Sequence, residues 1–241
     1  PDRTRMNAAD RETAERHLAV LEEFRRRPEA SPWAGRLSLP AEVAAMVGFV
    51  IPVEGEPVRC ALADALTRLN AGGCLLPYPR DYWHVTIVPP ALLAEGERPR
   101  PASGPTLLPA SFAQQALEMA RTAVRGVGPF EVSVRGVNAF RDVLVAVPYD
   151  GGRGLELGRV LRSALPELPE RYHTGHDLLP HISLAQYARG DRLEGLAALL
   201  EAERETPFGS FHVERLEMFV LPVHDGAPGP VEKHAIPLGR P

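Results

Sequence analysis

The sequence predicts an α+β fold made of two similar lobes that face each other across a cleft. Between residues 46 and 238, short apolar runs typical of buried strands alternate with apolar positions at helical spacing. The order strand, helix, strand, helix, strand occurs twice. The triplets His84-Val85-Thr86 and His181-Ile182-Ser183 lie at the same place in each copy, 97 residues apart. These observations indicate an internal duplication.

The repeat spacing also locates the parts of the chain. Phe130 and Phe211, in the third strand of each copy, are only 81 residues apart. The shortfall of 16 residues fits a loop at 91–110, rich in proline and glycine, that only the first copy contains. We expect a helical extension with a connector at residues 1–45, followed by one duplicated domain at residues 46–238. The first repeat of this domain covers about 46–141 and the second about 142–238.

The extension and the first copy contain elements with clear boundaries. Leu18, Leu21 and Phe24 predict a helix over residues 8–27, which Pro28 ends. Proline and glycine mark the ends of most later elements. The elements predicted for the first copy are a strand at 47–53, a helix at 58–69, a strand at 83–88 closed by Pro89 and Pro90, a helix at 111–124 and a strand at 130–137.

The second copy repeats this order. Leu157 and Leu161 lie on one face of its first helix. A strand region near the C-terminus is predicted to pair with a final strand across a turn rich in glycine and proline. The predicted elements are a strand at 143–148, a helix at 157–165, a strand at 181–185, a helix at 191–203, and strands at 211–223 and 234–238.

The composition excludes several classes of protein. Two cysteines, Cys60 and Cys74, are too few for a disulfide scaffold or a four-cysteine zinc site. The formal net charge of -4 argues against a protein that coats long nucleic acid. No apolar run approaches the roughly 20 residues that span a bilayer, and the charged N-terminus shows no secretory signal. We therefore expect a cytoplasmic monomer that does not associate with a membrane and has no obligate protein partner.

The two triplets carry the chemistry. On a strand, residues i and i+2 point to the same face, so each triplet presents one imidazole and one hydroxyl, from His84 and Thr86 or from His181 and Ser183. Two histidines can act as base and acid near neutral pH, and two hydroxyls can donate hydrogen bonds to phosphate oxygens. This set suits in-line attack on a phosphodiester, above all a strained 2',3'-cyclic phosphate, without a metal or another cofactor.

These paired motifs resemble the two-histidine (2H) phosphoesterase superfamily, and its 2'-5' RNA ligase-like, cyclic phosphodiesterase branch in particular. The resemblance covers residues 46–238, and the run from Gly136 to Arg141 before a strand is similar to a family motif. It implies two antiparallel-rich sheets with helices outside and both motifs at a central cleft. It implies hydrolysis of cyclic phosphate ends of RNA or nucleotides to 2'-phosphates, or reversible 2'-5' ligation. It also implies that Phe140 and Arg141 line the substrate pocket.

Several alternatives remain beside this interpretation. His173, His176 and His181 could hold a metal, although the spacing lacks a second group of ligands. Arg171 and His173 could instead help to bind the phosphate. The same scaffold could also serve as a non-catalytic module that binds an RNA end or a nucleotide, or as a phosphodiesterase for another cyclic or 2'-5'-linked nucleotide. The sequence does not specify which histidine is the base.

Overall fold

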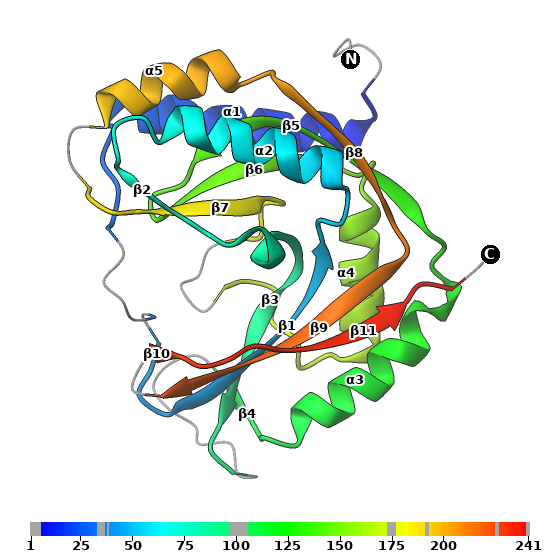
Figure 1. Cartoon of the computed structure of the whole chain (residues 1–241). Coiled ribbons are helices and arrows are strands. Elements are labelled where there is room, and N and C mark those ends of the chain that lie inside the picture. Colours follow the sequence, from blue (N-terminus) through cyan, green and yellow to red (C-terminus); the bar gives the residue numbers. More distant parts are fainter. Residues whose placement is uncertain are drawn as a thin grey trace.

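The computed structural model describes residues 6–32, 37, 39–96, 106–172, 177–190, 193–224 and 227–239. Within these ranges, five α-helices pack against a curled sheet of eleven strands (Figure 1). The helices are α1 (Ala8–Arg26), α2 (Glu56–Leu69), α3 (Phe112–Ala123), α4 (Arg153–Ala164) and α5 (Glu194–Glu203). The strands are β1 (Val43–Pro52), β2 (Leu75–Pro77), β3 (His84–Ala94), β4 (Leu107–Leu108), β5 (Phe130–Ala139), β6 (Val143–Tyr149), β7 (Ile182–Tyr187), β8 (Pro207–Val213), β9 (Arg215–His224), β10 (Ala227–Pro228) and β11 (Glu232–Pro237).

The sheet consists of two antiparallel halves that meet edge to edge. Its main path runs β10-β9-β1-β3-β7-β6-β5-β8, and β11 adds to the first half by pairing with β9. The halves join at β3 and β7, whose ladder in the described chain consists of the pair Val85 and Ile182. The predicted α+β class and its two antiparallel lobes are confirmed. The structure adds that the lobes share one continuous sheet, with the two motif strands as neighbours.

The chain crosses between the halves several times. Strands β8 and β9 are separated only by Glu214, yet β8 pairs with β5 in one half and β9 pairs with β1 in the other. Helix α2 follows β1 but packs on β8, whereas α4 follows β6 but packs on β3. Each half is therefore covered by a helix that the other half supplies. The division into two repeats at residues 141 and 142 stays a prediction.

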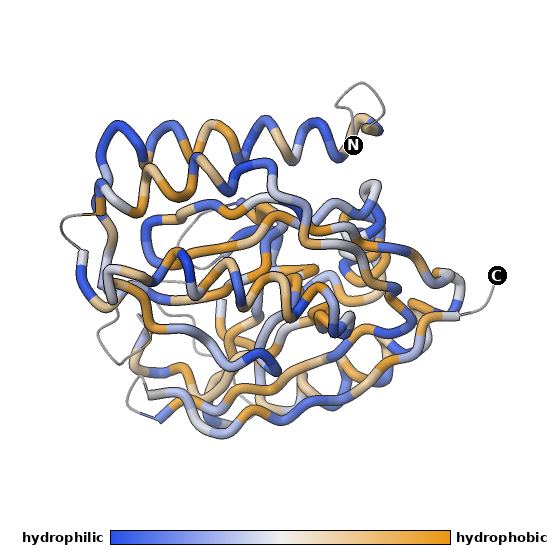
Figure 2. The backbone as a smooth tube through the Cα atoms, turned by 45° about the horizontal axis from the view of Figure 1, so that its top comes forward, coloured by the Kyte–Doolittle hydropathy of each residue, from blue (hydrophilic) through white to orange (hydrophobic). Residues whose placement is uncertain are grey.

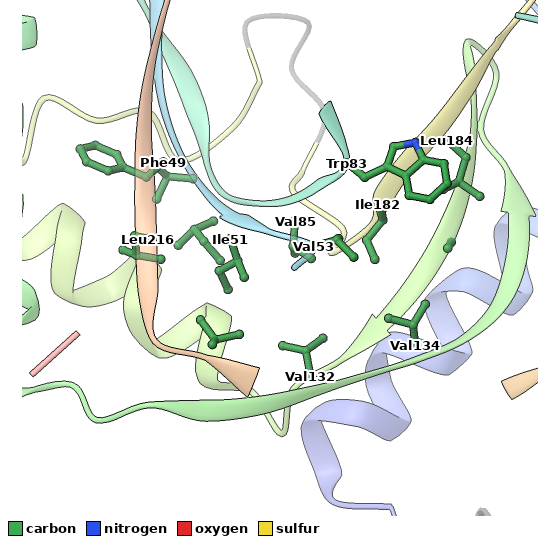
Figure 3. Packing of buried hydrophobic residues seen from close by; sticks show 14 of the residues in the cluster. Phe49, Ile51, Val53, Trp83, Val85, Val132, Val134, Ile182, Leu184 and Leu216 are labelled. Carbon is green, nitrogen blue, oxygen red and sulfur yellow. The ribbon is translucent and has the colours of Figure 1, made fainter. Parts of the chain in front are cut away.

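One apolar core lies within the curl of the sheet. Side chains from β1, β3, β7 and β5 converge in it (Figure 3); they include Ile51, Val85, Ile182 and Val134, each at most 2% exposed. Burial of such a side chain stabilises the fold by roughly 1.5–3 kcal/mol. Because Val85 and Ile182 point into this core, their neighbours along each strand must point to the opposite face of the sheet.

Strand β3 is longer than the sequence predicts. We expected Pro89 and Pro90 to end it, but it continues to Ala94. The register with β1 shifts here, so that both prolines lie opposite the single residue between Val47 and Phe49. At such a bulge, one residue is left unpaired and a missing N–H breaks less of the ladder. The predicted irregular loop at 91–110 is thus wrong at its start, and residues 97–105 lie outside the described chain.

The predicted N-terminal helix is present as α1. It packs against β5, β6 and α5 (Figure 1). Hydrophobic and hydrophilic residues alternate along it (Figure 2), and the buried ones are His17, Leu21 and Phe24. Main-chain and carboxylate contacts hold its ends, because Asp10 accepts from the N–H of Gly151 at 3.0 Å and Arg25 pairs with Glu201 at 3.1 Å. The extension is therefore an integral part of the second half.

Gly136 is a position where the fold requires glycine. Its φ is +81°, and a Cβ atom there would overlap the main-chain carbonyl of Arg204. We predict that Gly136→Ala lowers the free energy of unfolding by at least about 2 kcal/mol, since left-handed backbone alone costs about 1–2 kcal/mol for a residue with a side chain. Gly72→Ala is the control, because a Cβ there meets nothing within 4 Å. Urea denaturation measures both, and equal midpoints would contradict the argument.

Candidate active site

The first motif lies at the start of β3. Trp83 and Val85 are buried, whereas His84 and Thr86 are half-buried and lie on the other face of the strand. Trp83 points into the core beside Leu184 (Figure 3). Burial of the two apolar side chains therefore aims the imidazole and the hydroxyl away from the core.

The second motif lies at the start of β7 and repeats this pattern. Ile182 and Leu184 are fully buried, and His181 and Ser183 are half-buried on the opposite face. His181 comes one residue before the strand begins. The core therefore orients the second imidazole and hydroxyl in the same way as the first pair.

The antiparallel pairing of β3 with β7 brings the four polar side chains together. Because Val85 lies opposite Ile182, the register sets His84 beside Ser183 and Thr86 beside His181 on one face of the sheet. Directly opposite residues in such a ladder have Cβ atoms about 5 Å apart, and diagonal ones about 7–8 Å. The imidazoles therefore occupy one diagonal and the hydroxyls the other, a spacing that suits a single phosphate group between them.

Both motif histidines are held in the same way by the main chain. Nδ1 of His84 lies 2.6 Å from the carbonyl oxygen of Tyr82, and Nδ1 of His181 lies 2.7 Å from that of Leu179. A carbonyl can only accept, so each Nδ1 carries the proton and donates it. Each neutral imidazole then has its lone pair on Nε2. In both cases the acceptor is two residues earlier, so the local geometry is duplicated along with the motif.

The surroundings of both imidazoles favour the neutral form. Burial lowers the pKa of His84 to about 4, against the hydrogen bond to Tyr82, and the charges of His181 and Lys233 lower it further. Burial also lowers the pKa of His181, which the hydrogen bond to Leu179 and the charge of Asp142 oppose. Both rings are therefore uncharged at neutral pH in the free protein. An anion placed between them would favour protonation of one ring.

Three further side chains border this site, and the sequence analysis did not identify them. Tyr172 shares a hydrogen bond with Thr86. The ring of Phe219 lies 6.4 Å from that of His84, over Gly48, where a Cβ would approach the ring to 2.5 Å. Lys233 is the only lysine of the chain, just before the predicted strand at 234–238, and this was the one signal that the sequence offered. The other two belong to β9 and a loop, which only folding places here.

Lys233 sits at the edge of the site. Its Nζ donates to the carbonyl oxygen of Asp81 at 3.0 Å and lies 5.9 Å from the centre of the Tyr82 ring. It also lies 3.5 Å from a carboxylate oxygen of Glu217. The lysine therefore places a positive charge on the carbonyl of Asp81, the residue before the one whose carbonyl holds His84.

The four substrate-binding residues that the sequence predicts have different positions. The ring of Phe140 meets that of His181 edge to face at 4.9 Å. Arg141 is exposed, and Arg171 is in an exposed ion pair with Asp177 at 2.9 Å. His173 lies outside the described residues. Only Phe140 is thus placed against a motif histidine, and a role of any of the four in binding stays a prediction.

A cluster of metal-ligating side chains is not found in the described part of the chain. Among its residues, no three or more His, Cys, Asp or Glu side chains are placed to hold a metal ion. His176, part of the metal alternative, lies outside these residues.

None of the helices in the described chain has the length and apolar character needed to cross a membrane.

Solved structures with a similar fold include proteins from bacteria. TT0787 of Thermus thermophilus is 21% identical over 79% of this chain and 97% of its own, with a TM-score of 0.55. Escherichia coli LigT in its apo form is 17% identical over 80% of this chain and 98% of its own, with a TM-score of 0.52. LigT complexed with 3'-AMP is 16% identical over 80% and 99%, with a TM-score of 0.53. A search of curated proteins gives no match.

The sequence itself matches a family model. The model describes the 2'-5' RNA ligase superfamily and covers residues 58–224, which is more than half of the chain. The matched residues include both His-x-hydroxyl motifs. With the shared fold and the duplicated histidine geometry, this match shows that the chain belongs to the 2'-5' RNA ligase superfamily of two-histidine phosphoesterases.

Proposed function

We propose that the protein is a metal-independent phosphoesterase that opens the 2',3'-cyclic phosphate at the end of an RNA or on a nucleotide and leaves a 2'-phosphate. The observation that carries this proposal is the register of β3 and β7, in which Val85 pairs with Ile182. This register sets two imidazoles, each with its lone pair on Nε2, and two hydroxyls on one face.

The reaction needs only proton transfers at the two imidazoles. Nε2 of one histidine takes a proton from water, whose oxygen attacks the phosphorus atom. The bond from phosphorus to the 3'-oxygen breaks, and Nε2 of the other histidine, protonated at the start, gives its proton to that oxygen. His84 and His181 end with their protonation states exchanged. If a 5'-hydroxyl attacks in place of water, the same steps form a 2'-5' linkage.

The two hydroxyls have a different role in this proposal. Thr86 and Ser183 donate hydrogen bonds to the non-bridging phosphate oxygens, on which negative charge builds up during the attack. Each lies across the ladder from the histidine of the other strand. A phosphate between the four groups would therefore contact both strands at once, which aligns it with the base and the acid.

Two observations support a nucleotide substrate, the net charge of the chain and the structure of LigT with a bound nucleotide. A net charge of -4 disfavours contacts with many phosphates but permits a site for one. LigT, which shares the fold, was crystallised with 3'-AMP, a nucleotide with a phosphate on the 3'-oxygen. A module that only binds such an end would not need two imidazoles that each carry a lone pair on Nε2, so catalysis is the better account of the site.

We predict that His84→Ala and His181→Ala each reduce hydrolysis of nucleoside 2',3'-cyclic phosphates by about 10²–10⁴-fold, because each removes one of two required proton transfers. The wild type should remain active in EDTA. Formation of the nucleoside 2'-phosphate, followed by ³¹P NMR, measures the rate. Full activity in either variant would reject the mechanism, and loss of wild-type activity in EDTA would favour a metal.

Substitution of the hydroxyls tests the role of phosphate binding. Thr86→Val and Ser183→Ala keep the size of the side chain but remove the donor, so kcat should fall by about 10²-fold each. Thr86→Ser is the matched control, since it keeps the hydroxyl and should retain most of the activity. Equal activity of Thr86→Val and Thr86→Ser in steady-state kinetics would show that the hydroxyl has no part in the reaction.

The lowered histidine pKa values predict an acidic pH optimum. The competent free enzyme has one neutral and one protonated imidazole, and burial disfavours the protonated form of both. The singly protonated pair is therefore most abundant below pH 6.5, the ordinary pKa of histidine, and kcat/KM should have its maximum there. Bound phosphate favours imidazolium, so the maximum of kcat should lie at higher pH. A kcat/KM maximum on the alkaline side of that value would contradict this prediction.

A further inference from the structure

The N-terminal helix carries a buried histidine that the proposed mechanism does not use. His17 is 4% exposed, and its neighbour Asn138 is 2% exposed; they are the buried polar side chains of the described chain. A buried imidazole destabilises a fold unless its nitrogen atoms are hydrogen-bonded. The hydrogen-bond partners of His17 therefore indicate the role of this buried imidazole.

Both ring nitrogens of His17 have partners, and these define its tautomer. Nε2 lies 2.8 Å from the carbonyl oxygen of Pro180, so Nε2 carries the proton and donates it. Nδ1 lies 3.2 Å from Nδ2 of Asn138, which also donates to the main-chain oxygen of His17 at 2.7 Å. Oδ1 of Asn138 accepts from the N–H of Ala139 at 2.7 Å. Burial lowers the pKa of His17 to about 4, so this neutral form persists at neutral pH.

The acceptor of this hydrogen bond is the residue immediately before a motif histidine. Pro180 precedes His181, and the carbonyl of Leu179, one residue earlier, accepts from His181 itself. Residues 178–181 belong to no strand, and Pro180 has no N–H of its own to donate. The hydrogen bond from His17 therefore fixes a main-chain segment that no ladder holds at this point.

The first motif shows how the corresponding carbonyl is held without a helix. Trp83 precedes His84 as Pro180 precedes His181, and its carbonyl oxygen accepts at 3.0 Å from the main-chain N–H of Val53, the residue that follows β1. In one half the main chain beside β1 supplies the donor. In the other half the side chain of His17 supplies it. The contrast within one molecule indicates that each motif needs its preceding carbonyl to be held.

A second contact connects His17 with His181 through an aromatic ring. Phe140 lies between them, stacked on His17 at 5.8 Å with an angle of 14° between the rings, and edge to face with His181 at 4.9 Å. The main chain of Phe140 is fixed in turn, because its carbonyl accepts from the hydroxyl of Tyr187 at 3.1 Å. The imidazole of His181 is thus supported by a ring that His17 backs.

We infer that α1 is a working part of the active site, in which His17 is a positioning residue that orients His181 through the carbonyl of Pro180 and the ring of Phe140. The helix lies outside residues 58–224 that match the family model. The part of this inference that concerns catalytic rate rests on the proposed function, whereas the orientation of His181 can be measured without any assumption about the reaction. A small displacement of a catalytic group can lower a rate by about 10²-fold.

Three substitutions separate positioning from stability. His17→Leu fills the site but leaves the carbonyl of Pro180 without its donor, and we expect kcat to fall at least about tenfold with KM changed less than about threefold. His17→Gln places an amide N–H near the position of Nε2 and should recover most of kcat. Leu21→Ala, on the same buried face of α1, should lower the melting temperature without lowering kcat of the folded enzyme.

The outcomes discriminate clearly. Wild-type kcat in His17→Leu would overturn the inference, as would a loss of kcat in Leu21→Ala equal to that in His17→Leu. If His17→Leu does not fold, the same comparison is made with His17→Gln and His17→Asn. The shorter Asn amide cannot reach Pro180, so equal kcat in these two variants would also overturn it.

A spectroscopic measurement tests the geometry without any activity. ¹⁵N NMR of the imidazoles at neutral pH should show His17 protonated on Nε2, and His84 and His181 protonated on Nδ1. The His181 resonances should shift in His17→Leu, while those of His84 should not. A His17 protonated on Nδ1, or unchanged His181 resonances, would overturn the inference. If the wild type fails to hydrolyse cyclic phosphates, the proposed function is rejected, and these spectra still decide the positioning role.

Discussion

The geometry of the active site depends on one contact, the antiparallel pairing of Val85 with Ile182 where the two half-sheets join. The ladder at this seam is short, yet the core beneath it is continuous, because both side chains are buried in one apolar cluster. A register shift of one residue in either strand would turn the imidazole of that strand into the core and its apolar side chain outward. Burial of Val85 and Ile182 opposes this shift, so the hydrophobic effect maintains the spacing of the polar groups.

The two halves of the site are equivalent near the histidines and different further away. Each imidazole donates from Nδ1 to the carbonyl two residues earlier, which leaves Nε2 available for proton transfer. The carbonyl of the residue immediately before each histidine is also held. In one half its donor is the N–H of Val53, which follows β1, and in the other half it is the side chain of His17 on α1. Different elements therefore hold two nearly symmetric motifs. In the half where the main chain supplies no donor to the carbonyl before the motif histidine, the N-terminal helix supplies one.

Much of the fold could be predicted because local patterns and burial agree. The apolar runs at 47–53 and 143–148 became β1 and β6. Of the apolar residues that predicted α1, Leu21 and Phe24 are buried and Leu18 is half-buried. Pro89 and Pro90 misled the prediction, because a bulge opposite Gly48 tolerates their missing N–H groups. Tyr172, Phe219 and Lys233 could not be predicted as neighbours of the site, since their positions follow from contacts between segments that are distant along the chain.

By itself the sequence determined which residue types could carry the reaction, that two copies of the motif exist, and that alternation aims each imidazole and hydroxyl to one face. These are local properties, set by the period of a strand and by the side chains it buries. Tertiary structure alone decided that the motif strands are neighbours in one sheet, that His17 holds the segment before His181, and that Phe140 lies between these two rings. Such contacts depend on packing over long sequence separations, where no periodic pattern records the partner.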